Sequence, residues 1–128
     1  MKCQSIPILQ WNYFKAGPYT IILAKTACQI QQGLQGTKYL PSDTLLLFLN
    51  ISSGRYFHTQ NCHFIMDIIA LNNDGKILNR WLAKPGLKQV GPTPIGTTMV
   101  METNVGWMDR NNLHLGDSIP FVKSNLKK

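Results

Sequence analysis

Two apolar segments joined at Asp74-Gly75 constrain the fold more than any other feature of this chain. The first, "FIMDIIAL" at residues 64–71, is almost continuously apolar, and the second, "KILNRWLAK" at residues 76–84, follows after a short polar stretch. An Asp-Gly pair between two strand-like segments is a strong hairpin signal, because glycine accepts the positive φ that a tight hairpin turn requires. The sequence therefore predicts an antiparallel β-hairpin within a β-rich fold.

Further strand-like segments lie on both sides of this hairpin. β-Branched and apolar residues predict strands at 19–25, 44–50 and 97–103, with a further strand at 55–61. A turn at Gly116-Asp117 is expected to lead into a last strand that ends near residue 122. The spacing of these segments predicts one layered or barrel-like unit.

Two short helices complete the expected architecture. Thr26 is the expected N-cap of a helix at 27–32, which Gly33 or Gly36 would end. A helical turn is expected within 104–112, with Asn104 as its cap. The fold class predicted from these elements is α+β, mainly antiparallel β, in a compact barrel-like single domain with two short helices.

The length and composition predict one folded domain with short extensions. A chain of 128 residues, 44% of them hydrophobic, can bury a core without a metal or disulfide staple. We expect an irregular N-terminal lead-in at residues 1–18, a β-rich domain at 19–122 and a basic C-terminal tail at 123–128.

The N-terminal sequence, the cysteines and the hydropathy predict a cytoplasmic protein. "MKCQSIPILQWNYFKAG" lacks the apolar run of a signal peptide, and no stretch approaches the roughly 18 apolar residues that span a membrane. Cys3, Cys28 and Cys62 form an odd set without a CxxC pair. They are expected to be free thiols in a reducing compartment.

Asp67 is the one charged residue inside the apolar segment 64–71. A buried carboxylate is costly unless it is protonated, paired or hydrogen-bonded. The preferred interpretation is that Asp67 accepts backbone N–H bonds from a neighbouring loop and pins it. In the alternative, Asp67 forms a polar ligand pocket with Asn61 and Glu102. Because the sequence shows neither a shifted pKa nor substrate access, we assign no catalytic residue.

The charge balance raises a second candidate site. The net charge of +7 favours anionic partners. Lys76, Arg80 and Lys84 are expected on one face of the second hairpin strand, with Lys88 just beyond, and this basic face could track nucleic-acid phosphates. The preferred interpretation is that basic residues on an edge strand block edge-to-edge pairing.

The histidines and cysteines do not predict a metal site. In an extended segment His58 and Cys62 would face one way and His63 the other, so only two ligands converge, whereas structural zinc needs four. We therefore expect no metal and no cofactor.

The order of several motifs resembles the DUF192 family, small β-rich proteins of unassigned activity. The motifs are "QQGLQGTKYLPSDTLLLFLN", "FHTQNCHFIMDIIALNNDGKIL" and "TTMVMETNVGWMDRNNLHLGDSI", and the resemblance covers about residues 19–120. Positions that match the family pattern are Gly33, Leu34, Leu40, Pro41, Asp43, Leu47, Phe48, Asn61, Asp67, Asp74, Gly75, Glu102, Gly116 and Asp117. The family's Trp, Met and Pro are replaced here by His58, Thr59 and Ile65, which alters any aromatic-lined pocket that the resemblance implies.

The function expected from the sequence is that of a non-catalytic interaction or structural module. Such a module, a component of a larger assembly, would contact other protein chains through its termini and basic face, without a membrane. Whether the chain is an enzyme stays open, with the preference against it. The first alternative is a small-ligand or enzymatic pocket around Asn61, Asp67 and Glu102, and the second is nucleic-acid binding through the basic face.

Overall fold

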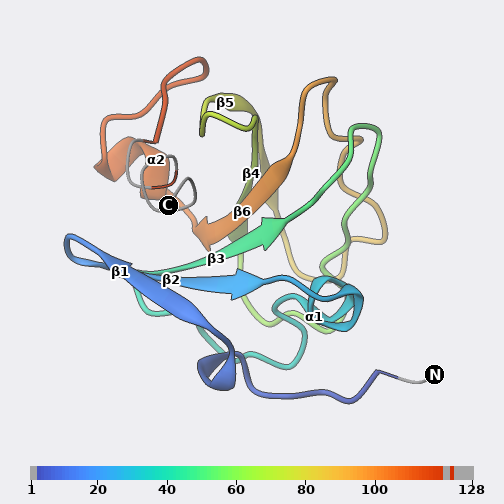
Figure 1. The fold of residues 1–128 in the computed structure, drawn as a ribbon. Coiled ribbons are helices and arrows are strands. Elements are labelled where there is room, and N and C mark those ends of the chain that lie inside the picture. The colour runs from blue at the N-terminus through green and yellow to red at the C-terminus, as the bar shows by residue number, and fades with distance from the viewer. Residues whose placement is uncertain (1–2, 120–121, 123–128) are drawn as a thin grey trace.

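A six-stranded sheet organises the computed structural model, which describes residues 3–119 and 122 (Figure 1). The strands lie in the order β1-β2-β3-β6-β4-β5. The elements along the chain are η1 (Ile8–Gln10), β1 (Tyr13–Ala16), β2 (Tyr19–Ala24), α1 (Ala27–Gln32), β3 (Thr44–Leu49), β4 (Met66–Leu71), β5 (Ile77–Ala83), β6 (Met99–Asn104) and α2 (Trp107–Arg110).

The sheet is mixed and open. β2 and β3 are parallel, with α1 in the connection between them, and the other neighbouring pairs are antiparallel. β1 and β5 lie at opposite ends of the strand order and do not close it, so the barrel-like shape is not confirmed. The predicted β-rich fold with two short helices is confirmed.

The predicted hairpin is the pair β4 and β5, whose register runs from Met66 opposite Ala83 to Leu71 opposite Ile77. β4 also pairs with β6 on its other edge, and all six of its residues are buried. A strand that is interior to the sheet and covered on both faces needs apolar residues at both parities. This explains why residues 64–71 form a nearly continuous apolar run.

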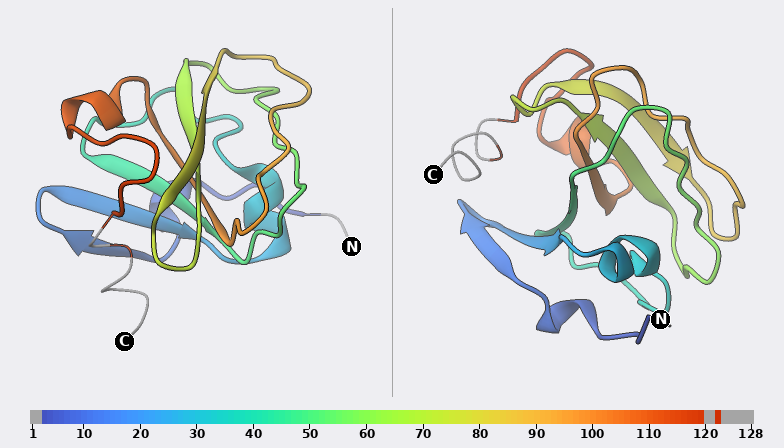
Figure 2. Two further views of the ribbon diagram at one scale, coloured as in Figure 1. Left: turned by 90° about the horizontal axis from the view of Figure 1, so that it is seen from above. Right: turned by 45° about the vertical axis from the view of Figure 1, so that its right-hand side comes forward.

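Each face of the sheet carries its own core, and the two helices cover opposite faces. The first core is built from even-numbered residues of β4 and β6, including Ile68 and Val100, and Ile30 of α1 packs against it. The second core is built from odd-numbered residues of the same strands, including Ile69 and Met101, and contains Trp107 of α2. Figures 1 and 2 show α1 and α2 on opposite sides of the molecule.

Helix α1 follows the predicted capping. The Thr26 hydroxyl accepts the Gln29 N–H at 3.1 Å, and the Gln29 side chain accepts the Thr26 N–H at 3.2 Å. This reciprocal pair satisfies backbone donors that a helix start leaves open. Gly33, at φ +51°, is the C-cap residue.

Several predicted elements differ from the structure. The segment 55–61 forms only an isolated bridge between Phe57 and Val90, and the described part of the last predicted strand forms only a bridge between Lys76 and Ser118. Residues 1–18, expected to be irregular, contain η1 and β1, and α2 is capped at Gly106 rather than Asn104. The basic tail at 123–128 lies outside the described residues.

The expectation of three free thiols is wrong. Cys3 and Cys28 form a disulfide, with their Cα atoms 5.2 Å apart, and Cys62 is free and buried. The same segment is also held by Gln32, whose side chain accepts the Ile6 N–H at 3.1 Å and donates to the Ile6 carbonyl at 2.8 Å. The lead-in is therefore fastened to α1, and it passes below this helix in Figure 1.

No helix within the described residues has the length and apolar character needed to cross a membrane.

The disulfide predicts a specific thiol count. Protein denatured without reductant should expose one reactive thiol, that of Cys62, and three after reduction. Reduction should lower the stability by about 2–4 kcal/mol, since the crosslink restricts the unfolded chain. Thiol titration and thermal melts measure both effects. The melting temperature of Cys28→Ser should not respond to reductant, and three thiols in the unreduced protein would contradict the crosslink.

Candidate functional site

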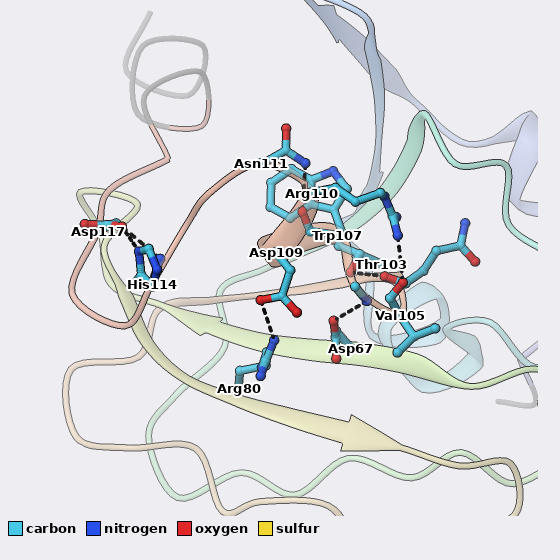
Figure 3. A network of polar contacts seen from close by, with 12 residues as sticks. Asp67, Arg80, Thr103, Val105, Trp107, Asp109, Arg110, Asn111, His114 and Asp117 are labelled. Carbon is cyan, nitrogen blue, oxygen red and sulfur yellow. Dashed lines mark hydrogen bonds and ion pairs between the residues drawn. The ribbon is translucent and has the colours of Figure 1, made fainter.

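Asp67 fastens the loop that follows β6. Its Oδ2 accepts the backbone N–H of Gly106 at 3.0 Å, and the residue is 2% exposed. Figure 3 shows this contact beside the ion pair between Arg80 and Asp109, whose closest atoms are 3.9 Å apart. Burial raises the pKa of Asp67, and the hydrogen bond from Gly106 and the nearby Arg80 oppose that rise. The geometry is that of a carboxylate pinning a loop.

Removal of the Asp67 carboxylate should destabilise the fold. Asp67→Ala leaves the Gly106 N–H without its acceptor inside the protein, at an expected cost of about 1–3 kcal/mol. The control is Asp109→Ala, which breaks only the exposed ion pair with Arg80 and should cost about 0–1 kcal/mol. Chemical denaturation measures both. Equal stabilities of Asp67→Ala and the parent protein would disprove the pinning role.

The sheet separates Asp67 from Glu102. Asp67 pairs with Thr103, and the next residue, Ile68, pairs with Glu102. Since successive residues of a strand point to opposite faces, the two carboxyl groups lie in different cores. Asn61 is exposed, and its amide donates to Gln35 Oε1 at 3.3 Å. The structure therefore does not bring the three predicted pocket residues together.

Glu102 instead reaches a cavity of about 380 Å³ on the α1 side of the sheet. We call it the Glu102 cavity. It lies between α1 and the segment 55–58, with Glu102, Phe48 and Cys62 among its lining residues. The other lining residues are Ala27, Ile30, Gln31, Gln32, Gly33, Leu34, Arg55, Tyr56, Phe57 and His58. This volume is within the usual range for small-molecule sites.

The wall at 55–58 is held by a second long loop. Phe57 and Val90 exchange backbone hydrogen bonds of 2.8 and 2.7 Å. Arg55 is bound by Thr93, whose hydroxyl accepts the Arg55 N–H at 2.9 Å and whose N–H donates to the Arg55 carbonyl at 2.9 Å. Figures 1 and 2 show the two loops side by side. This irregular wall is therefore anchored although it forms no strand.

Aromatic rings and a glycine shape the interior. The Phe48 and Phe57 rings meet edge to face, with centroids 5.3 Å apart. At Gly33, a Cβ atom would lie 3.4 Å from Phe48 Cζ and 3.7 Å from Glu102 Oε1. Together with its positive φ, this close approach explains why glycine suits position 33. The end of α1 thereby comes close to the Glu102 carboxyl group.

The Glu102 carboxyl group is buried, and one of its oxygens has no hydrogen-bond partner among the described residues. The residue is 3% exposed, and among the described residues no group hydrogen-bonds to its Oε1. Burial raises the pKa of Glu102 to about 8, so the acid is mostly protonated and neutral near pH 7. Burial, with a contribution from Glu102, raises the pKa of the Cys62 thiol to about 12. The cavity floor therefore carries an uncharged acid and an inert thiol.

The raised pKa predicts a pH-dependent cost of folding. Protonation of Glu102 stabilises the fold fully below the unfolded pKa of 4.5, and this contribution is lost as the pH rises through about 8. Glu102→Gln, which cannot ionise, should therefore match the parent protein near pH 4 and exceed its stability above pH 8, by on the order of 5 kcal/mol at most. Melts across this pH range test the sign. If the difference in stability between Glu102→Gln and the parent protein does not change with pH, the pKa of Glu102 is not raised.

The predicted basic face is not one surface of β5. Ile77 pairs with Leu71 and Arg80 pairs with Ile69, and both partners belong to the second core. Residues three apart would face opposite sides under strict alternation, so a register irregularity in the hairpin interrupts that alternation. Lys76 precedes this irregularity, while Lys84 and Lys88 follow the end of β5. Arg80 also pairs with Asp109. The shared face expected from strict alternation is therefore interrupted at Lys76, and the basic face as a phosphate-binding surface stays a prediction.

No metal centre is found within the described residues, which contain no group of three or more His, Cys, Asp or Glu side chains that could hold an ion. His58 and Cys62 both line the Glu102 cavity. His58 Nδ1 accepts the Gln60 N–H at 3.2 Å, which occupies one of its ring nitrogens.

The fold and site define a small protein with an open mixed sheet and a cavity floored by a buried acid. The chain belongs to the DUF192 family, described as "Uncharacterized ACR", whose model matches residues 13–121. The expected family resemblance is thereby confirmed.

Two crystal structures share the fold. A protein from Sinorhizobium meliloti 1021, described as a candidate transcription regulator, has a TM-score of 0.70 and 24% identity over 78% of this chain and 79% of that one. A protein of unknown function from Novosphingobium aromaticivorans DSM 12444 has a TM-score of 0.70 and 22% identity over 90% and 89% of the two chains. No curated protein matches the chain. These similarities show the fold alone.

Sequence reasoning named Glu102 as a pocket residue but missed its neighbours. Gly33 and Phe48 were matched to the family pattern without a place in a pocket. Cys62 was weighed for metal binding, and His58 for metal binding and as a replacement of the family's Trp. Arg55 and Phe57 were placed only in an expected strand at 55–61, which gave them no role in a pocket.

Proposed function

We propose that this protein binds a small organic ligand in the Glu102 cavity. The observation that carries the proposal is the buried Glu102 Oε1, which lacks a hydrogen-bond partner among the described residues and belongs to a residue that lines the cavity. Buried polar atoms nearly always have a partner, and an orphan costs about 1–3 kcal/mol. A ligand that hydrogen-bonds to the carboxyl group would recover this free energy.

The cavity supports binding better than catalysis. A nucleophilic cysteine needs an accessible thiolate, whereas burial keeps the Cys62 thiol protonated. His58 is within the same cavity, but one ring nitrogen accepts a local backbone N–H. The neutral Glu102 acid can both donate and accept a hydrogen bond, and aromatic walls offer apolar contact. These properties suit recognition of a partly polar, partly apolar molecule.

A blocked cavity tests the proposal. Ala27 is exposed at the start of α1 and lines the cavity, so Ala27→Trp should fill its mouth without disturbing the core. Lys25→Trp adds the same ring two residues earlier, outside the lining residues, and is the matched control. We expect members of a library of small organic fragments to shift the NMR signals of Cys62, Phe57 and Glu102 in the parent protein and in Lys25→Trp. Ala27→Trp should lose these shifts.

Two results would count against ligand binding at this site. Either no fragment perturbs the cavity signals, or Ala27→Trp binds the fragments as well as Lys25→Trp does. Both variants should melt near the parent protein, which separates blocking from unfolding.

An interaction role, the function that the sequence favours, is a second proposal. Its support is a group of exposed apolar side chains near one end of the sheet. Leu82 is 61% exposed and pairs with Asp67. Ile65 lies just before β4 and Val105 just after β6, so both exposed side chains are at the same end of these paired strands. Exposed apolar groups of this kind mark contact surfaces when they adjoin. Contacts through the termini and nucleic-acid binding stay predictions.

A further inference from the structure

Arg55 provides a positive charge at the Glu102 cavity that has no acidic partner. The Arg80–Asp109 ion pair and the His114–Asp117 contact use other residues, and within the described part of the chain no carboxylate pairs with Arg55. Its guanidinium carbon lies 5.8 Å from the centroid of the Phe57 ring, a distance at which cation and ring attract. The backbone of Arg55 is bound on both sides by Thr93. Arg55 is exposed, and no carboxylate in the described part of the chain uses its charge.

The other walls of the cavity add no opposing charge. α1 has no charged residue, and β3 presents Phe48. The residues that pair with Glu102 are Leu46 of β3 and Ile68 of β4, while the one charged residue of β4, Asp67, faces the opposite core.

The remaining titratable groups in the lining are Tyr56, His58 and Cys62. The thiol of Cys62 stays neutral because burial raises its pKa to about 12. As long as Glu102 is protonated, the cavity therefore carries the Arg55 charge and no negative charge.

We propose that the ligand of the Glu102 cavity is a small organic anion whose charged group pairs with Arg55 and whose apolar body lies against the Phe48 and Phe57 rings. A hydrogen-bonding group of the same molecule meets the Glu102 carboxyl. This inference rests on the proposed function and assigns the ligand class. A guanidinium binds carboxylate and phosphate oxygens through paired hydrogen bonds, which favours an anion over a neutral molecule of the same shape.

The protonation state of Glu102 gives this inference a direction with pH. As a neutral acid, Glu102 donates a hydrogen bond and does not repel an anion. Since its pKa is about 8, it ionises as the pH rises through that value and then repels an anionic ligand. Anion affinity should therefore fall with rising pH, whereas a cationic ligand would gain affinity over the same range.

Three compounds with one ring and different charges test the ligand class. Benzoate is an anion, benzamide is neutral and benzylammonium is a cation. Near pH 6, we expect benzoate to bind about tenfold more tightly than benzamide, equivalent to about 1.4 kcal/mol, and benzylammonium to bind most weakly. Affinities come from NMR titration of the Cys62 and Phe57 signals.

Variants of the two polar residues test how the anion is recognised. Arg55→Gln should reduce the benzoate affinity to that of benzamide, whereas Lys15→Gln, an equal charge change on β1, should not. The benzoate affinity of the parent protein should fall as the pH rises through about 8, and that of Glu102→Gln should show no such fall. Melting curves confirm that each variant is folded.

The outcomes separate this inference from the function on which it rests. Tightest binding of benzylammonium, or undiminished benzoate binding in Arg55→Gln, would overturn the anion assignment while a ligand site remains. If none of the three compounds binds but other fragments shift the cavity signals, the anion assignment is also wrong and the proposed function stands. If no fragment of any kind reaches the cavity, both fail.

Discussion

Burial of the inner strands on both faces is the constraint on which the rest of the structure depends. β4 and β6 lie side by side inside the sheet, with a separate core on each face. Every polar side chain on these strands therefore needs a hydrogen-bond partner among the residues that cover its own face, because water is excluded from both faces. Asp67 is satisfied by the Gly106 N–H, whereas Glu102 Oε1 is not satisfied by any described residue.

This difference assigns different roles to two acids that look alike in the sequence. The face of Asp67 is covered by the loop before α2, which supplies a hydrogen-bond donor, so the carboxylate stabilises the fold. The face of Glu102 opens toward a cavity walled by α1 and an irregular segment. Buried polar groups without a hydrogen-bond partner are expected at functional sites, where a ligand supplies the missing partner.

Local chemistry made much of the fold predictable, and long-range contacts explain what was missed. Asp74-Gly75 and the capping box at Thr26 act over a few residues, so their elements were found. The Cys3–Cys28 disulfide depends on the lead-in returning along α1, which the spacing of the cysteines does not reveal. The predicted cluster with Asn61 failed because that residue sits in a turn at φ +62° and bonds to Gln35.

The sequence by itself determined β2, β3, β6, the β4–β5 hairpin, the first helix cap and the family, because each depends on neighbouring residues or on motif order. Only the tertiary structure decided which face of the sheet each acid occupies and what lies over it. The reason is that β4 gained β6 as a neighbour across a long stretch of chain, and this pairing placed Glu102 beside Ile68 rather than beside Asp67. That placement puts the Glu102 carboxyl group among the residues that line the cavity.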